Sequence, residues 1–391
     1  MPDEDLRQLE RAWREDRGDR AVLERLIEAR LRLGMPVPGE EREARFLPPR
    51  AFDSRLTLHV QALAPGGSKP LGIGKTPAGA GGLAIPGHAT WWVIPAPPGK
   101  CDLDALRDEI AARGIPGVSF EKKKIDGRGL AKLAGLGLST LLLKECRRVT
   151  DAGLEHVATL RNLAWLDLTR TGVTDAGLVH LAALPHLFSL KLWKDYSCPP
   201  LTRVAAGHLA RCTNLMRLDI AGCPLGREGL EQLGGLTELR ELGLMDCELT
   251  DADLVALGRL EKLEVLDVTG NTLGDAALGH LAGASRLRRL RIMGSITAEG
   301  LRRLAPIPAL TDLDLPGGVT ITDESLEALA AFPALERVDF GACPFALERG
   351  LASLPERRFD LCYDPPSPAF FAALEGLLDA RVLPRPKTRA R

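Results

Sequence analysis

A repeated leucine pattern constrains the fold of this 391-residue chain more than any other feature. Aligned on Leu-x-x-Leu-x-Leu, segments recur mostly every 23 to 25 residues, and one interval is longer by four. The nine segments begin at Leu138, Leu163, Leu187, Leu215, Leu239, Leu263, Leu287, Leu310 and Leu335. Self-similarity at a fixed period is the signature of a repeat architecture. The pattern therefore predicts an array of like units.

Each unit has two halves with different periods, as 163-LAWLDLTRTGVTDAGLVHLAALPH-186 shows. Leu166 and Leu168 alternate with a polar residue, which predicts a short strand with its leucines inward. Thr174 is then placed to cap a helix whose leucines follow at helical spacing. One such unit is too small to bury its own leucines, so the units must stack. The predicted fold is an α/β solenoid.

The full pattern resembles a known family. Leu-x-x-Leu-x-Leu-x-x-Asn/Cys/Thr followed by Thr-Asp-Ala-Gly-Leu is similar to the leucine-rich repeats of bacterial proteins of the ribonuclease-inhibitor-like and cysteine-containing classes, over about residues 115–364. The resemblance implies a curved solenoid with parallel strands on the concave face, helices on the convex face, and work in protein recognition. It also implies a column of small buried polar side chains that hold the loop leaving each strand: Cys146, Thr171, Cys223, Cys247, Asn271 and Cys343.

The two ends differ from the repeats. Apolar spacing in residues 1–50 predicts a helical hairpin, and residues 365–391 are expected to form a capping helix and a basic tail. Between the N-terminal hairpin and the repeats, residues 51–114 are predicted as a mixed α/β segment that caps the first repeat. That segment should contain strands at 55–63 and 89–96, a Gly/Pro-rich loop at 64–88 and a helix at 103–112.

The stretch 71-LGIGKTPAGAGG-82 looks like a phosphate-binding loop, but its spacing fails. If Gly74, Lys75 and Thr76 end the motif, its first glycine falls on Lys69. Pro77 and the glycines after it resist the helix that must follow. We therefore predict no nucleotide cofactor and interpret the stretch as part of the 64–88 loop.

Neither a metal site nor a catalytic centre is predicted. Four histidines recur in one column on the helix side, where adjacent helices are too far apart for easy sharing of one ion: His156, His180, His208 and His280. No serine lies in a Gly-x-Ser-x-Gly elbow, and no cysteine pair has zinc-ligand spacing. We expect no enzyme, with the N-terminal segment as the one place where an activity could reside.

Charge and hydropathy restrict the environment and the partners. The formal net charge is −1, so no global field attracts nucleic acid or an anionic membrane. No apolar run approaches the length of a membrane span, and the charged N-terminus lacks a signal-peptide core. We expect a cytoplasmic protein whose partner is another protein.

The predicted concave face supplies the candidate binding residues. The middle positions of the repeat strands, taken together, should form one mainly acidic ladder interrupted by two cations: Leu142, Asp167, Lys191, Asp219, Gly243, Asp267, Arg291, Asp314 and Asp339, with Asp360 next. The long interval inserts extra residues at 193–201, and Trp165, Trp193 and Tyr196 could form an aromatic patch there. Two alternatives stay open, because the ladder could be merely solvated and Trp193 could pack on its own loop.

These features predict a non-enzymatic module that binds a protein through the concave face and the 193–201 insertion. Two sharper versions remain open: an inhibitor or immunity-type protein that blocks a toxin or enzyme, and the substrate-targeting subunit of a larger complex. An enzyme with its activity in the N-terminal segment is the third class. The sequence names neither the partner nor the oligomeric state.

Overall fold

The computed structural model describes residues 50–63, 69–76, 82–85, 90–95, 102–341, 343–346, 360–363 and 382–384. The hairpin predicted at 1–50 lies outside this part except for Arg50. Of the segment 365–391, predicted as a capping helix and a basic tail, only Val382–Pro384 is described, and it is a strand. The chain divides into two compact units. The first comprises Met1–Leu192 with Tyr196–Pro199, and the second comprises Trp193–Asp195 with Pro200–Arg391.

The first unit begins with a cap of antiparallel strands. β2 (Leu58–Leu63) pairs with β3 (Leu71–Lys75) on one side and β5 (Thr90–Pro95) on the other, while β1 (Arg50–Phe52) pairs with β4 (Leu83–Ile85). Helix α4 (Leu103–Arg113) starts at the N-cap Asp102, which accepts from two backbone amides, and ends at the left-handed Gly114. The strands expected at 55–63 and 89–96 and the helix at 103–112 are confirmed.

One expectation about this cap is wrong. Residues 64–88 do not form a single loop, because β3 and β4 lie within them. Gly72 and Gly74 indicated a loop on composition alone, yet Gly74 is needed for packing. A Cβ on Gly74 would lie 2.7 Å from Leu83 Cδ2, so the glycine lets β4 approach β3.

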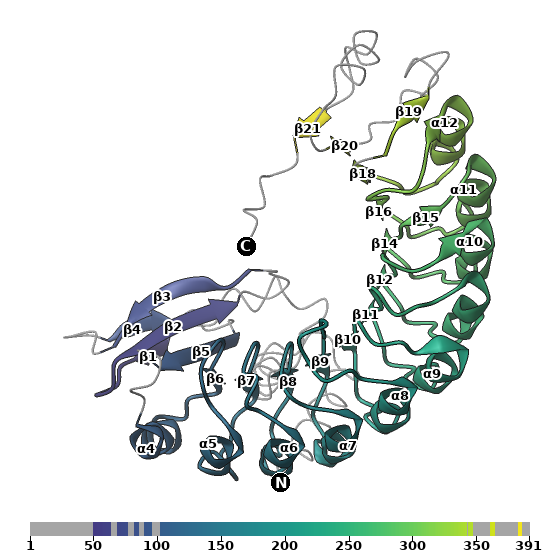
Figure 1. Cartoon of the computed structure of the whole chain (residues 1–391). Helices are drawn as coiled ribbons and strands as arrows, with labels where there is room; N and C mark the ends of the chain where they lie inside the picture. Colours follow the sequence, from purple (N-terminus) through teal and green to yellow (C-terminus); the bar gives the residue numbers. More distant parts are fainter. Residues whose placement is uncertain are drawn as a thin grey trace, which may run out of the picture. The chain divides into compact units, whose positions relative to one another are not determined.

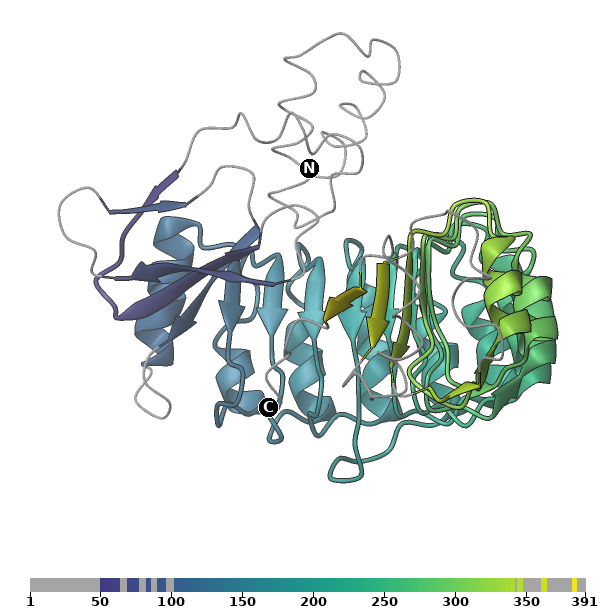
Figure 2. The same cartoon turned by 90° about the horizontal axis from the view of Figure 1, so that it is seen from above.

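The repeats of the first unit join this cap through β5, which pairs in parallel with β6 at Val93 and Val118. Figure 2 shows the purple strands of the cap beside the first blue and teal repeat strands. The remaining elements are β6 (Gly117–Ser119), α5 (Gly127–Ala131), β7 (Thr140–Leu142), α6 (Asp151–Val157), β8 (Trp165–Asp167), α7 (Asp175–Leu178), the 3₁₀ helix η1 (Val179–Ala183) and β9 (Ser189–Lys191). Leu141, Leu166 and Leu190 pair in register and are fully buried under the helices.

The second unit repeats the same strand and helix order (Figure 1). Its repeat strands are β10 (Arg217–Asp219), β11 (Glu241–Gly243), β12 (Val265–Asp267), β14 (Arg289–Arg291), β16 (Asp312–Asp314), β18 (Arg337–Gly341), β20 (Asp360–Tyr363) and β21 (Val382–Pro384). Its helices are α8 (Arg203–Leu209), α9 (Gly226–Leu233), the 3₁₀ helix η2 (Asp251–Arg259), α10 (Asp275–Leu281), α11 (Ala298–Leu304) and α12 (Asp323–Ala330). Two short parallel pairs join β13 (Leu273–Gly274) to β15 (Gly294–Ser295) and β17 (Ile321–Thr322) to β19 (Phe345–Ala346).

The Thr-Asp-x-Gly-Leu motif links one repeat to the next. Thr174 is the N-cap of α7, but its hydroxyl makes no cap hydrogen bond within that helix. It donates instead to Asp151 Oδ2 of the preceding repeat at 2.7 Å, and its amide donates to Oδ1 at 2.7 Å. A Cβ on Gly177 would lie 2.4 Å from that Oδ1 atom, so the motif's glycine makes room for the carboxylate. The expected helix start is confirmed, whereas the expected capping bond is replaced by an inter-repeat bond.

The buried polar column holds the loops as the resemblance implied. Cys146 Sγ donates to Phe120 O at 2.8 Å, and Cys343 Sγ donates to Leu315 O at 3.1 Å, each across to the preceding repeat. Asn271 makes the most bonds, because its amide group both accepts from and donates to the backbone. The side chains of this column therefore satisfy backbone groups that the strand-to-helix turns leave unpaired.

Candidate functional site

The sheet has one face covered by helices and an opposite face, called here the strand face (Figure 1). The middle positions of the repeat strands form the ladder predicted for this face. In the first unit, backbone pairing places Leu142 beside Asp167 and Asp167 beside Lys191. In the second unit the in-register order is Asp219, Gly243, Asp267, Arg291, Asp314 and Asp339. Within each unit, the ladder residues therefore have the register that the sequence predicted.

Asp360 does not extend this ladder. It pairs with Arg337, and Cys362 pairs with Asp339. The run Phe359-Asp360-Leu361 imitates the Leu-Asp-Leu of other strands, but the register is displaced by two residues. A shift of two keeps a residue on the same face while moving it into the next column. The prediction that Asp360 continues the acidic column is wrong for this reason.

Four ladder aspartates close the turn that follows their strand. In each, Oδ1 accepts a hydrogen bond from the backbone amide two residues later: Asp167 from Thr169 at 2.9 Å, Asp219 from Ala221 at 3.3 Å, Asp267 from Thr269 at 3.0 Å and Asp339 from Gly341 at 2.9 Å. Such an Asx turn is a structural use of a short carboxylate. One oxygen of each aspartate thus stabilises the repeat.

Arginines of neighbouring strands neutralise part of the ladder in the second unit. Arg291 lies 3.3 Å from Asp267, and Arg337 contacts both Asp314 at 3.6 Å and Asp312 at 2.9 Å. In the adjacent column, Arg289 and Asp312 form a further pair at 3.4 Å. These partly exposed pairs contribute little to stability. They make the strand face of this unit a mixed-charge surface instead of an acidic one.

Asp314 differs from the other ladder aspartates. Two residues later stands Pro316, which has no backbone N–H to donate. Asp314 Oδ1 is buried and has no hydrogen-bond partner within the described part of the chain. Burial raises the pKa of the Asp314 carboxyl above its ordinary value, and the nearby Arg337 opposes that shift. The ladder therefore contains one carboxylate whose negative charge lacks the turn-closing hydrogen bond that stabilises the other aspartates.

This difference predicts how Asp314→Asn behaves. A raised folded-state pKa stabilises the fold below the ordinary aspartate pKa, and this contribution is lost as pH rises through the folded-state pKa. At pH 7 we expect Asp314→Asn to be at least as stable as the parent, with the difference moving in the variant's favour between pH 3 and 7. Asp267→Asn, which weakens the contact with Arg291, should lose a few tenths of a kcal/mol. Urea midpoints measured across this pH range check both, and equal losses at pH 7 would contradict the assignment.

Trp165 lies at the start of its strand and packs against a tryptophan of the cap. Its ring meets Trp92 edge to face, with ring centroids 6.0 Å apart. Gly117 makes this possible, because a Cβ there would lie 2.8 Å from Trp92 Cβ and 2.9 Å from Thr140 Cβ. The indole nitrogens of both tryptophans are buried, without a hydrogen-bond partner among the described residues. Sequence reasoning placed 89–96 in a strand but overlooked Trp92, which its position beside the first repeat could have suggested.

The 193–201 insertion is anchored at both ends. The amide of Lys194 donates to Ala221 O at 3.1 Å, and Lys194 O approaches Gly222 so closely that a Cβ there would lie 2.3 Å away. Leu201 is fully buried. Between them Tyr196 is entirely exposed, whereas Trp193 is half-buried. Of the three predicted aromatic residues, Tyr196 is therefore the one that presents its whole side chain to solvent.

Three thiols of the described repeats are buried and chemically inert. Burial raises the pKa of Cys146 and Cys247 to about 12 and that of Cys212 to about 11, so these groups stay protonated and unreactive near neutral pH. Across the described ranges no cluster of three His, Cys, Asp or Glu side chains could hold a metal ion. No described helix is long and apolar enough to cross a bilayer.

Comparisons with known proteins agree with this architecture. A leucine-rich-repeat family model matches residues 211–234 and 259–282. No curated protein shows a significant match. An internalin (InlF) of Listeria monocytogenes is similar in structure, with a TM-score of 0.50 and 20% identity over 67% of this chain and 70% of that chain. A leucine-rich-repeat protein of Leptospira interrogans aligns with a TM-score of 0.46 and 17% identity over 72% and 74%. The predicted solenoid fold is confirmed, while the finer repeat class stays a prediction.

Proposed function

We propose that this chain, a leucine-rich-repeat protein by its repeats and its fold, binds a protein partner through the strand face and the 193–201 insertion. The observation that carries this proposal is the ladder, which holds charged side chains in one register on the face opposite the helices. Strands about 4.8 Å apart place neighbouring ladder positions at regular intervals, so a partner can meet them with complementary charges. The role is one of binding without catalysis.

The contacts on this face favour a partner of mixed charge. Asp267 and Asp314 keep arginine neighbours, so a purely basic partner would have to compete with those arginines. A partner that presents both signs can instead extend the existing pairs. Tyr196 adds a large exposed side chain of the type that anchors interfaces. The ladder would orient the partner, and Tyr196 would add affinity.

The state of the cysteines bears on the compartment that we propose. Six of the described cysteines, four of which belong to the buried column, form no disulfide. Free thiols persist in a reducing environment, which supports the proposal of a cytoplasmic protein.

The experiment compares variants that preserve the fold. The partner is first isolated by affinity capture from cells of the source organism, and its dissociation constant is then measured by calorimetry. We expect Tyr196→Ala to weaken binding by roughly 10- to 30-fold, as for an interface anchor. Asp219→Asn with Asp267→Asn should weaken it by about tenfold, because asparagine keeps the turn-closing oxygen and removes only the charge.

A matched control uses the opposite face of the same unit. Glu228 on α9 is exposed and pairs with Arg203 at 3.5 Å, much as Asp267 pairs with Arg291. Glu228→Gln therefore removes one carboxylate of a surface pair away from the strand face, and it should leave the dissociation constant unchanged. Unchanged binding after all three changes at Tyr196, Asp219 and Asp267 would refute the proposal.

A further inference from the structure

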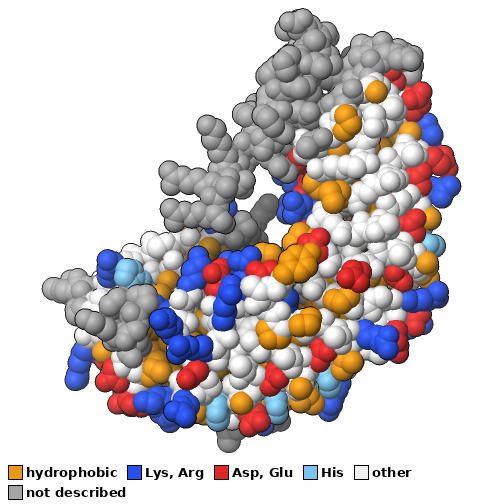
Figure 3. Space-filling model, viewed as in Figure 1, with side chains coloured by type: hydrophobic (Ala, Val, Ile, Leu, Met, Phe, Trp, Pro, Cys, Tyr) orange, Lys and Arg blue, Asp and Glu red, His pale blue; other side chains and the backbone are white. Residues whose placement is uncertain are grey.

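A second charged surface lies on the first unit, outside the ladder. The loops that leave β6 and β7 read 121-EKKKIDGR-128 and 144-KECRR-148. Residues 121–148 contain eight Lys and Arg against three Asp and Glu, in a chain whose formal net charge is −1. Six of these cations are defined here as the basic edge: Lys122, Lys123, Lys124, Arg128, Arg147 and Arg148. Figure 3 shows blue side chains gathered over this part of the molecule.

The basic edge is not neutralised within the described chain. Lys144 pairs with Glu121 at 3.7 Å in the same loops, and Arg170 pairs with Glu145 at 3.7 Å. No described carboxylate lies within ion-pair distance of any of the six basic-edge cations, and all are exposed except the half-buried Lys123. The strand-face arginines of the second unit, by contrast, are paired. The charge of the basic edge is therefore available to a partner.

Backbone bonds bring the two loops side by side. The amide of Phe120 donates to Leu142 O at 2.8 Å, and the amide of Lys122 donates to Lys144 O at 2.9 Å. Lys122 has a φ of +59°, the left-handed conformation that recurs after the repeat strands at Glu145, Arg170, Gly222, Asp246 and Gly270. A lysine accepts strain here that a glycine avoids.

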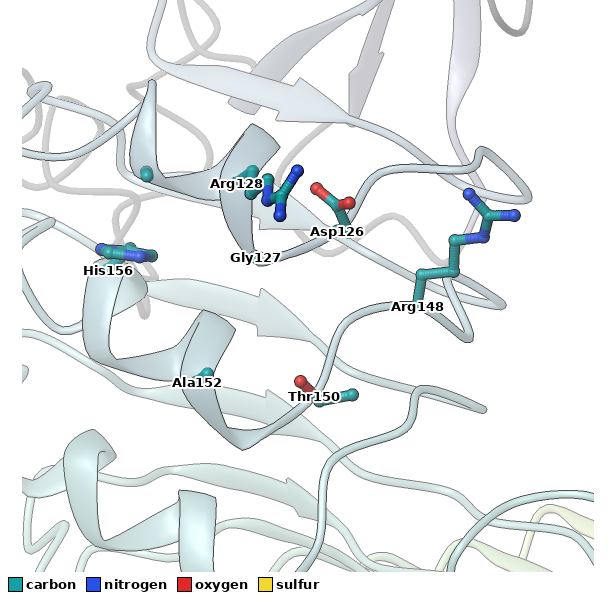
Figure 4. Close-up of a pocket in the computed structure, with 8 residues that line it drawn as sticks. Asp126, Gly127, Arg128, Arg148, Thr150, Ala152 and His156 are labelled. Carbon is teal, nitrogen blue, oxygen red and sulfur yellow. The ribbon is translucent and has the colours of Figure 1, made fainter.

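A groove adjoins the basic edge between α5 and α6. Its volume is about 490 Å³, and it is lined by Asp126, Gly127, Arg128, Ala131, Arg148, Thr150, Ala152 and His156. Figure 4 shows Arg128 and Arg148 on the two sides of Asp126, with His156 at the other end. A Cβ on Gly127 would lie 3.6 Å from Gly153 Cα, so the two helices meet backbone to backbone and leave a shallow floor of small residues. Guanidinium groups at its rim suit planar carboxylates.

We propose that the basic edge and this groove bind an acidic protein segment rich in Asp and Glu, independently of the strand face. Carboxylate side chains fit the arginines, and their methylene groups fit the alanines and glycines of the groove. A nucleic acid fits less well, because neither the basic edge nor the groove offers a Phe, Tyr or Trp ring for base stacking. The surface lies on the loops and helices, so it leaves the ladder free for the partner proposed above.

The test uses the full-length protein and a fluorescein-labelled 12-residue peptide of alternating Glu and Asp. Fluorescence anisotropy should show saturable binding that weakens at least tenfold between 50 and 300 mM NaCl, since counterions screen exposed charges. The variant Lys122→Gln, Lys124→Gln, Arg147→Gln, Arg148→Gln should weaken binding at least tenfold. The matched control Arg211→Gln, Arg259→Gln, Arg286→Gln, Arg288→Gln removes the same charge from the second unit and should bind as the parent does. These four arginines are exposed and have no ion-pair partner among the described residues.

Further measurements distinguish this proposal from a nonspecific effect of charge and from binding of a nucleic acid or a membrane. Lys122→Gly relieves a left-handed backbone, so it should melt no lower than the parent while weakening the peptide by about threefold. If the two quadruple variants lost the same affinity for the peptide, the proposal would be overturned, because the net charge of the protein and not the position of the cations would then explain binding. Tighter binding of a 12-nucleotide single-stranded DNA or of phosphatidylserine vesicles than of the peptide would also overturn it. Capture of the strand-face partner should be unchanged in the basic-edge variant.

Discussion

Replacing Gly300 with alanine should lower the free energy of unfolding by about 2–4 kcal/mol. A Cβ at this position would lie 2.2 Å from Asp275 Oδ1 of the preceding repeat. That carboxylate accepts from the Thr297 amide at 2.8 Å and the Thr297 hydroxyl at 2.6 Å. The added methyl group must therefore displace a charged group that already holds the start of α11. Urea unfolding followed by far-ultraviolet circular dichroism measures the loss.

Gly279→Ala is the control of opposite sign. Gly279 lies inside α10, and the nearest atom to a new Cβ is Arg303 Cδ at 3.8 Å, an ordinary contact. Alanine lowers the entropic cost of a helix interior, so this variant should be more stable by about 0.5–1 kcal/mol. Two glycines of neighbouring repeats then respond in opposite directions. Similar effects of both substitutions would show that the motif's glycine does not serve the carboxylate.

The largest loss is expected for Asn271→Ala, at about 3–5 kcal/mol. Asn271 Oδ1 accepts from the amides of Cys247 and Leu249, both at 3.0 Å. Its Nδ2 donates to Leu244 O at 2.8 Å and Val268 O at 2.9 Å. Alanine leaves these buried backbone groups without their partner, and each unsatisfied group costs roughly 1–3 kcal/mol. The same urea titration reports this change.

Cys247→Ala tests the same column with weaker bonds. The Cys247 thiol donates to Ile220 O at 3.5 Å, a sulfur contact that contributes less than an amide bond. We expect this variant to lose only about 1–2 kcal/mol, mostly through packing. If Cys247→Ala cost as much as Asn271→Ala, the column would act through volume and not through hydrogen bonding.

The repeat architecture was predictable because its signal is local and recurs. Leu166 and Leu168 alternate in the sequence and are fully buried in β8, and the column of Cys146 and Asn271 bonds as the resemblance implied. Contacts between repeats were harder to predict. The hydroxyl of Thr174 was expected to cap its own helix, but the Asp151 carboxylate of the neighbouring repeat offers a charged acceptor. Gly74 indicated a loop, although it allows two strands to pack.

The candidate site was predictable in position but not in electrostatics. The alternation of each strand fixed which side chains share a face. The predicted column was mainly acidic, with Lys191 and Arg291 as its two cations. Its ion pairs were not predicted, because the pairing of Arg291 with Asp267 and of Arg337 with Asp314 joins different repeats. Pro316 is visible in the sequence two residues after Asp314. Its effect, the loss of the turn-closing hydrogen bond to Asp314, could be recognised only once the other ladder aspartates were seen to close their turns.

Hydroxyl-radical footprinting of the purified complex with the captured partner tests the central claim most directly. The reactive side chains Tyr196, Met245 and Met293 lie on the insertion or in turns after strand-face positions, whereas His208 and His280 lie on helices α8 and α10. We predict that complex formation protects the first three residues and leaves the two histidines as reactive as in the free chain. Protection of His208 and His280, with Tyr196, Met245 and Met293 unchanged, would contradict recognition through the strand face.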